Sequence, residues 1–431
     1  MSRWPWLRTG QGGLLLCAGV AAGLSVGTPV NGTAQLLVPM DEAQANHLKA
    51  YGLAYGVLAA GETAEWLLNY RFGAFLLPDT PEKRRRAALM GVTVERLDAS
   101  GLTRLRRTVE ETNAESVPLE KAPRVAVYTP PNSSPWDDAV TLALTYAEIP
   151  YTRIWDREVL GGGLERFDWL HLHHEDFTGQ YSKFYLTYAS ATWLQEEVAR
   201  NEQMALELGF PSVPELKKGV ARALREYVEG GGFLFAMCTA TETLDLALAA
   251  GPVDIAASFA DRTPMDPAAE SRLEWTRALA FQGVSLITDP GLSAFSDIDG
   301  HQVNTPWRRP LGSFVLFDFS AKFDPVPSML TQNHERVLSD YYGLTTTFRR
   351  ARLKPGVTVL AEEPGTGLVK YIHGSVGRGT FTYLGGHDPE DPRHLIGDPP
   401  TELDLHPHSP GYRLILNNVL FPAAKKKKLK T

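Results

Sequence analysis

Residues 227–241 decide the fold of this chain, and they read YVEGGGFLFAMCTAT. The run 233–237 is wholly apolar, which is typical of a central parallel strand covered on both faces. An amphipathic helical pattern over residues 214–230 precedes it and ends in glycines, and Cys238 is followed by polar residues that open another helix. A helix, a buried strand and a helix in succession predict an α/β fold with a mostly parallel sheet.

Strand and helix patterns alternate on both sides of this segment. They predict a doubly wound sheet over residues 119–424, with insertions at about 251–345. A smaller N-terminal α/β unit is predicted over residues 35–118, with a helix over 81–90, and it ends in a linker at 118–123. The strands expected in the larger unit are 125–128, 151–155, 169–173, 233–237, 357–362, 368–373 and 380–384, and its main helices are 136–147, 214–230 and 410–420.

The composition limits the classes of function. The chain has 431 residues, of which 43% are apolar and 22% charged, so it is an ordinary globular protein. Its net charge of −7 gives no reason to expect nucleic acid as a partner. Two cysteines cannot form a disulfide scaffold or a four-cysteine zinc site. No phosphate-binding loop or dinucleotide fingerprint occurs, so we predict no cofactor and no metal.

The first 34 residues have the pattern of a cleavable signal peptide. Arg3 and Arg8 precede the small apolar run 12–27, and a small-x-small exit ends at Ala34. We therefore expect export to the periplasm or the medium, although a buried first helix would give a similar pattern. No apolar stretch after residue 40 approaches the ~20 residues needed to span a bilayer. The end, residues 425–431, is a basic tail.

Three polar clusters follow three of the predicted strands. They are residues 171–176, residues 238–242 and residues 387–391. Ligands bind outside the carboxyl ends of the strands in open α/β sheets. The three clusters are therefore expected to meet at one edge of the sheet, and the site is predicted there.

Cys238 stands on a sharp turn from strand to helix, where a nucleophile is exposed above a sheet and helix N–H groups stabilise an oxyanion. The alternative is a small buried hydrophobe at the end of a core strand. His387 is the candidate general base, oriented by Glu390 or Asp388. These residues predict covalent hydrolysis of an amide or related C–N bond.

A second group of residues is predicted to line the substrate pocket: His173, His174, Glu175, Asp176 and Thr239. The same histidine run allows an alternative, a metal-assisted hydrolase with zinc held by His173 or His174, Glu175 and His387. The histidines could instead bond only to neighbouring groups. Asp137 and Asp138 stand at the opening of the helix predicted over 136–147, where we expect carboxylates to cap it.

The segment 227–238 resembles the central helix, glycines and strand of class I glutamine amidotransferase-like domains, closest to the trehalose-utilisation (ThuA-like) branch. Residues 373–387 are similar to the final hairpin and Gly-His end of that branch. The resemblance implies flavodoxin-like layers, with a cysteine nucleophile at Cys238 and a histidine partner at His387. In those enzymes an acid stands two residues after the histidine, where this chain has Pro389.

The chain from about residue 36 onward also resembles a family of exported bacterial proteins commonly labelled asparagine synthetase B. The shared features are residues 136–138, 171–176, 388–391 and 421–425. The N-terminal cysteine and the ATP-binding loop of asparagine synthetases are absent, so we expect no ATP-dependent amide synthesis. The partner is a small-molecule or cell-envelope substrate. A third hypothesis is a non-catalytic module that stacks glycan or peptidoglycan on Trp136, Trp169, Tyr181 and Tyr185. The oligomeric state is left open.

Overall fold

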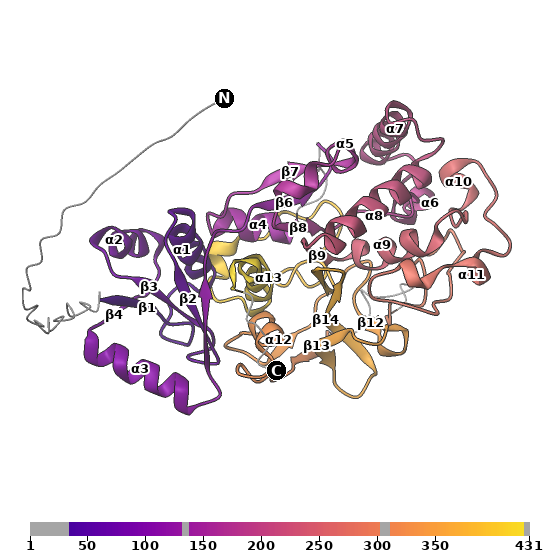
Figure 1. The fold of residues 1–431 in the computed structure, drawn as a ribbon. Helices are drawn as coiled ribbons and strands as arrows, with labels where there is room; N and C mark the ends of the chain where they lie inside the picture. Colours follow the sequence, from indigo (N-terminus) through magenta and orange to yellow (C-terminus); the bar gives the residue numbers. More distant parts are fainter. Residues whose placement is uncertain (1–33, 132–137, 302–310, 426–431) are drawn as a thin grey trace, which may run out of the picture. The chain divides into compact units, whose positions relative to one another are not determined.

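The computed structural model describes residues 34–131, 138–301 and 311–425, and these described residues form one compact unit. The predicted signal peptide up to residue 33 and the basic tail after Lys425 lie outside the described residues, as does Trp136. Figure 1 shows the strands and the helices that surround them. Among the described residues, no helix is both long and apolar enough to cross a membrane.

The first sheet is built by residues 35–119. Its strands are β1 (Gln35–Val38), β2 (Ala64–Leu68), β3 (Ala74–Pro78), β4 (Glu95–Leu97) and β5 (Glu115–Leu119), in the order β4-β1-β3-β2-β5 with every neighbour antiparallel. The accompanying helices are α1 (His47–Ala59), α2 (Pro81–Met90) and α3 (Ala99–Glu111). A linker is predicted at 118–123, but its first two residues, 118 and 119, are the last two of β5.

Local sequence explains the ends of α2. Thr80 accepts a hydrogen bond from the N–H of Lys83, and Pro81 occupies the first turn. Gly91 ends the helix in the left-handed conformation, with φ at +68°. These caps explain why the sequence predicts this helix at the bounds that the structure shows.

The second sheet is mixed, so the α/β class is confirmed while the expectation of a mostly parallel sheet is wrong. Five parallel strands lie in the order β7-β6-β8-β9-β15, and the sheet continues from β15 through β14, β13, β10 and β11 with antiparallel neighbours. Short β12 pairs with β14. The bounds are β6 (Val125–Tyr128), β7 (Thr152–Ile154), β8 (Trp169–Leu172), β9 (Phe233–Met237), β10 (Ser313–Leu316), β11 (Val337–Ser339), β12 (Phe348–Arg349), β13 (Thr358–Glu363), β14 (Leu368–Val376) and β15 (Gly379–Leu384).

The alternation of side chains along β9 explains why the whole strand is apolar. Phe233, Phe235 and Met237 join the hydrophobic cluster that includes α4 (Ala139–Tyr146) and α13 (Pro410–Leu420). Leu234 and Ala236 join the cluster that includes α8 (Val213–Glu229) and α9 (Thr239–Ala250). Helices therefore cover both faces of this strand, as its sequence predicts. The remaining helices of four residues or more are α5 (Asp156–Leu160), α6 (Tyr185–Tyr188), α7 (Thr192–Glu207), α10 (Ser258–Asp261), α11 (Ala269–Arg272) and α12 (Pro325–Leu330).

The two sheets share one hydrophobic cluster. It includes Leu36 of β1, Tyr51 of α1, Trp66 of β2, Phe235 of β9 and Leu416 of α13. Tyr51 also donates a hydrogen bond of 2.5 Å to Asn417 of α13. One face of the first sheet therefore packs into the shared core, while the other face packs with α3 in a smaller separate cluster that includes Leu37, Leu76 and Leu105.

Candidate functional site

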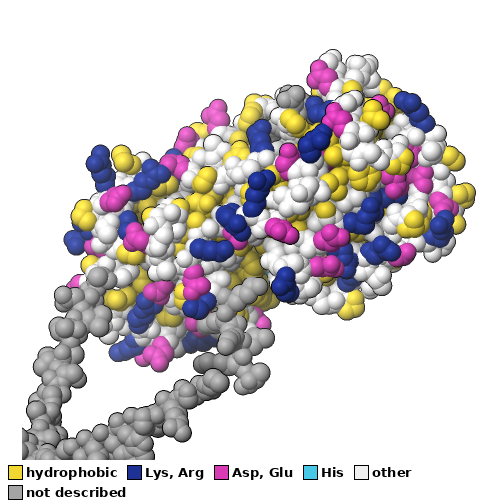
Figure 2. All heavy atoms as spheres, turned by 45° about the horizontal axis from the view of Figure 1, so that its top comes forward, with side chains coloured by type: hydrophobic (Ala, Val, Ile, Leu, Met, Phe, Trp, Pro, Cys, Tyr) yellow, Lys and Arg dark blue, Asp and Glu magenta, His cyan; other side chains and the backbone are white. Residues whose placement is uncertain are grey.

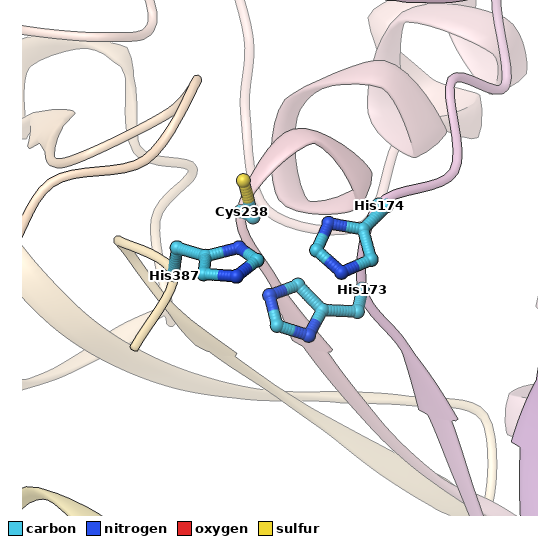
Figure 3. Close-up of side chains that lie close together, drawn as sticks. All are labelled: His173, His174, Cys238 and His387. Atoms are coloured by element: carbon cyan, nitrogen blue, oxygen red, sulfur yellow. The ribbon is translucent and has the colours of Figure 1, made fainter. Parts of the chain in front are cut away.

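Three of the predicted polar clusters meet beyond the carboxyl ends of β8, β9 and β15. His173 and His174 follow β8, Cys238 follows β9, and His387 follows β15. One ligand-type atom from each of these four residues lies within 4.8 Å of all the others. Figure 3 shows the three imidazole rings gathered beside Cys238. Parallel pairing of the three strands places their ends at one edge, which is why the sequence allows this prediction.

Cys238 has a backbone conformation that side chains other than glycine rarely adopt. Its φ is +51° and its ψ is −135° at the junction between β9 and α9. Its N–H donates to the carbonyl of Gly386 at 3.1 Å, and its carbonyl accepts from the N–H of Thr241 at 3.2 Å. Such a conformation costs about 1–3 kcal/mol and is concentrated at functional sites. The strained turn supports the prediction of a nucleophile at this junction.

The surroundings of the sulfur favour the thiolate. The Leu344 N–H donates to Sγ at 3.4 Å, and the Thr239 hydroxyl lies 3.7 Å from it. Burial raises the pKa of the Cys238 thiol, but the hydrogen bond and charge of His387, together with the Leu344 N–H, outweigh burial and hold the pKa below its ordinary value. Cys238 is only 3% exposed, so a substrate reaches the sulfur only after neighbouring groups move.

A buried carboxyl group fixes the loop that carries Leu344. Glu242, one turn into α9, accepts hydrogen bonds from the hydroxyls of Thr345 at 3.0 Å and Ser296 at 2.5 Å. Burial raises the pKa of Glu242 to about 8, against the opposing effect of these hydrogen bonds. Gly386 makes the close packing of this region possible: its φ is +90°, and a Cβ there would lie 2.6 Å from the ring of Tyr341.

The histidines are connected to Asp138, the cap of α4. Asp138 accepts from the N–H groups of Val140 and Thr141, as predicted for a cap. It also lies 3.2 Å from Nδ1 of His173 and 3.3 Å from Nε2 of His171. Burial raises the pKa of Asp138, but the two histidines outweigh it and lower the pKa well below its ordinary value.

His173 is buried and turns one nitrogen toward the other site residues. Burial lowers its pKa to about 4, against the opposing effect of Asp138. Within the described part of the chain, its Nε2 is buried without a hydrogen-bond partner. The ring centroid lies 3.9 Å from that of His174 and 4.6 Å from that of His387. Such a buried nitrogen lone pair is a potential ligand for a cation.

The two acids predicted to orient His387 are bound elsewhere. Asp388 accepts hydrogen bonds from Thr401 at 2.9 Å and Tyr412 at 2.8 Å, and from two backbone N–H groups. Glu390 pairs with Nδ1 of His406 at 3.0 Å. The structure thus gives both carboxylates other roles, because the chain turns sharply after His387 and they face the α13 side of that turn.

His394 is the residue that sequence reasoning missed. Its ring stacks on that of His387 at 4.3 Å with 15° between the planes, and its Nδ1 lies 2.7 Å from Asp391. Asp391 is included in the sequence prediction only as part of the polar cluster 387–391. The spacing of Asp391 and His394, three residues apart, could have indicated a contact between them, but the segment has no periodicity that would indicate which way His394 points.

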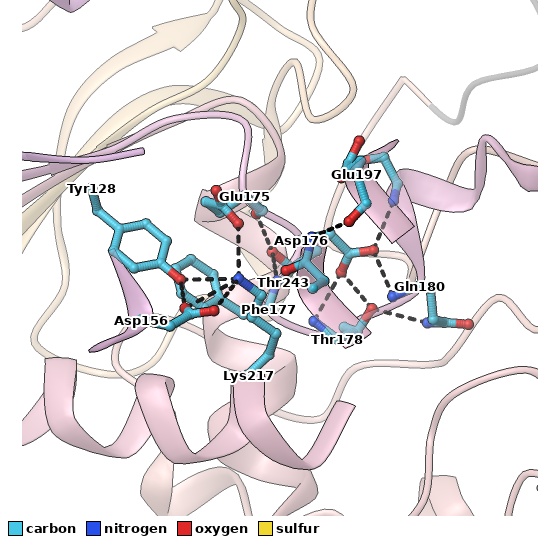
Figure 4. A network of polar contacts seen from close by, with 12 residues as sticks. Tyr128, Asp156, Glu175, Asp176, Phe177, Thr178, Gln180, Glu197, Lys217 and Thr243 are labelled. Atoms are coloured by element: carbon cyan, nitrogen blue, oxygen red, sulfur yellow. Dashed lines mark hydrogen bonds and ion pairs between the residues drawn. The ribbon is translucent and has the colours of Figure 1, made fainter. Parts of the chain in front are cut away.

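Glu175 and Asp176 have other polar partners, which are Lys217 for Glu175 and Thr178 and Gln180 for Asp176 (Figure 4). Glu175 pairs with buried Lys217 at 3.3 Å, and Lys217 also lies 3.2 Å from Asp156. The Asp176 carboxylate accepts from the N–H groups of Thr178, Gln180 and Ser182 and so shapes its own loop. The metal set that included Glu175 is therefore not assembled, whereas Thr239 does lie beside the sulfur, as predicted.

The aromatic residues proposed for sugar stacking are mostly buried. Trp169 is fully buried in the core, and Tyr181 is buried as well. Tyr185 is 38% exposed, and its ring stacks on that of Phe259 at 5.5 Å. Of these three, only Tyr185 is exposed enough to stack on a sugar.

A groove of about 1060 Å³ lies at the opposite edge of the parallel sheet from Cys238. It is lined by residues at the amino ends of the strands, including Asp168, Phe233 and Thr380. This groove is thus far from the strained cysteine. We place the chemistry at Cys238, because none of the residues that line the groove is a cysteine or a histidine.

Comparisons with known proteins give little further information. No family model and no curated protein matches this sequence. Solved structures that are similar include the Cytoplasmic Protein STM3548 from Salmonella typhimurium, at 11% identity and a TM-score of 0.34, covering 70% of this chain and all of that one. A beta-galactosidase from Bacillus circulans sp. alkalophilus is 10% identical, with a TM-score of 0.25, and the match covers 61% of this chain and 28% of that one.

Proposed function

We propose that this protein hydrolyses an amide or related C–N bond through a thioester on Cys238. The observation that carries the proposal is the left-handed Cys238 at the β9–α9 junction, with the Leu344 N–H and His387 directed at its sulfur. A strained turn between a strand and a helix presents a nucleophile in many hydrolases. Burial as a structural thiol alone would not require this strain.

The residues have separate roles in the reaction. The Cys238 thiolate attacks the carbonyl carbon, and the carbonyl π electrons move to oxygen, where the backbone N–H of Thr239, the first residue of α9, stabilises the charge. When the C–N bond breaks, His387 donates a proton to the leaving nitrogen. His387 then removes a proton from water, which attacks the thioester and restores the thiolate. The products are a carboxylic acid and an amine or ammonia.

In this scheme Asp391 acts through His394 as the acid that orients His387, the role predicted for Asp388 or Glu390. A carboxylate that orients a histidine is the third member of such a site. Here Asp391 holds His394, and His394 stacks on His387, so the acid restricts the base through a second ring. His394 is a positioning residue in this scheme.

The topology supports a class I glutamine amidotransferase-like architecture for the larger unit. The parallel strands β6, β7, β8, β9 and β15, numbered one to five, lie in the order 2-1-3-4-5. This is the order of flavodoxin-like doubly wound sheets, in which ligands bind at the carboxyl edge.

On the face shown in Figure 2, basic and acidic side chains are interspersed. The proposal includes export and a small-molecule or cell-envelope substrate.

The test is the rate at which iodoacetamide alkylates Cys238 in metal-free, folded protein as a function of pH. The background is Cys17→Ser, so that Cys238 is the only thiol. We expect the rate to rise with a midpoint below the ~8.5 of an ordinary thiol, and the midpoint to move upward in His387→Ala. His406→Gln, a half-buried histidine paired with Glu390, is the control. An ordinary midpoint that His387→Ala leaves unchanged would refute the proposal.

A further inference from the structure

The cysteine site contains more basic groups than a hydrolytic thiol requires. One imidazole is sufficient to move the protons of acyl transfer. Here three imidazoles, from His173, His174 and His387, stand around the sulfur with one potential ligand atom from each residue within 4.8 Å of the others. Two of these residues and the cysteine are buried.

His173 has the arrangement of a metal ligand. Its Nδ1 faces the Asp138 carboxylate at 3.2 Å, while its Nε2 is buried and has no hydrogen-bond partner among the described residues. Histidines that bind metals usually present the second nitrogen to a carboxylate or carbonyl in this way. His173 is 2% exposed, so water does not readily satisfy Nε2.

We propose that His173, His174, Cys238 and His387 bind a zinc-class divalent cation. Three imidazole nitrogens and a thiolate are ligands that Zn²⁺ prefers. With metal–ligand bonds of about 2.0–2.3 Å, tetrahedral ligands stand roughly 3.3–3.8 Å apart, so the group would contract by about 1 Å on binding.

The cation has a defined consequence for the proposed hydrolysis. A thiolate bound to zinc has its lone pair engaged and attacks a carbonyl poorly, so the ion inhibits the enzyme reversibly. This consequence depends on the proposed function, whereas binding of the ion does not. Glu175 is outside the ligand set because it pairs with Lys217.

The first experiment adds Co²⁺ alone to metal-free Cys17→Ser protein. We expect a thiolate-to-metal absorption band in the near ultraviolet and the visible bands of a tetrahedral site, both removed when Zn²⁺ displaces Co²⁺. Cys238→Ser should lose the near-ultraviolet band. His406→Gln should keep every band, because His406 is outside the group. Absence of the near-ultraviolet band in the parent protein, or its persistence in Cys238→Ser, would overturn the proposal.

A second variant tests the carboxylate without removing a ligand. Asn caps helices as well as Asp does, so Asp138→Asn should keep α4 capped while it removes the negative charge that faces Nδ1 of His173. We expect Co²⁺ affinity to fall about 10–100-fold. An unchanged affinity would place the ion elsewhere and refute the assignment of His173.

Alkylation in the same preparations separates the two proposals. If no cation binds while the alkylation rate of Cys238 has a low midpoint pH, the metal site is wrong and the hydrolytic site is retained. If the cation binds through sulfur while alkylation of the metal-free thiol has the midpoint pH of an ordinary thiol, the metal site is retained and the hydrolytic proposal is wrong. With both correct, Zn²⁺ should protect Cys238 from alkylation.

Discussion

At the residue scale, the backbone of Cys238 allows a prediction about stability. Its φ of +51° and ψ of −135° favour glycine. We therefore expect Cys238→Gly to be more stable than Cys238→Ala by about 1 kcal/mol, since removal of strain worth about 1–3 kcal/mol exceeds the extra backbone entropy that glycine loses on folding. The measurement is the urea midpoint of both variants. If the alanine variant is equal or better, the turn is not strained.

The sequence predicts residues of this kind only where a regular element leads into them. Cys238 and His387 were identified because each follows an apolar strand whose end is well marked. His394 was not, because six irregular residues separate it from His387 and its position depends on the ring stacking and on Asp391. The second role of Asp138 was also missed, since capping α4 accounts for an aspartate at that position.

At the scale of elements, Glu242 connects α9 with the loop that carries Leu344. Its pKa is raised by burial to about 8, above the ordinary 4.5, so the folded state holds a proton that the unfolded state releases. This stability is present at low pH and is lost as the pH rises from about 4.5 through about 8. The parent protein should lose stability on the order of a few kcal/mol between about pH 5 and about pH 8.5, measured by urea midpoints at the two pH values. Glu242→Gln should not show this loss. The exposed Glu196→Gln is the control, and equal pH dependence in both variants would contradict the assignment.

Elements were predictable where apolar patterns are continuous. The structure places β6, β9, α2 and α13 at their predicted bounds. In contrast, α7 was missed, because only Leu194, Asn201 and Ala205 of its residues are buried and it shows no apolar stripe. The hairpin of β14 and β15 was predicted and is confirmed, because a short turn joins its strands. The antiparallel strands beyond β14 and the antiparallel first sheet were not predicted as such, since strand direction there depends on long-range pairing.

At the scale of the whole molecule, a histidine cluster joins the first sheet's helix α1 to α13. His47 lies 3.0 Å from His408 between their Nδ1 atoms and stacks on His334 at 4.3 Å, and Arg413 contacts His334 at 2.8 Å. Burial, then the Arg413 charge, lowers the pKa of His47 to about 2 and that of His334 to about 4. His47 and His334 are therefore neutral in the folded protein at neutral pH.

Acid should weaken this junction before it weakens the rest of the fold. Because the folded pKa of His334 lies below the ordinary 6.5, the unfolded chain takes up its proton first, so stability falls as the pH drops from about 6.5 toward about 4. Glu335, at 4.0 Å from His334, opposes this only weakly. His334→Gln keeps an acceptor for Arg413 and should reduce the loss of stability at acid pH, measured by urea midpoints, whereas His406→Gln should not. An equal loss of stability in the parent and in His334→Gln would mean that the cluster does not control the contact between α1 and α13.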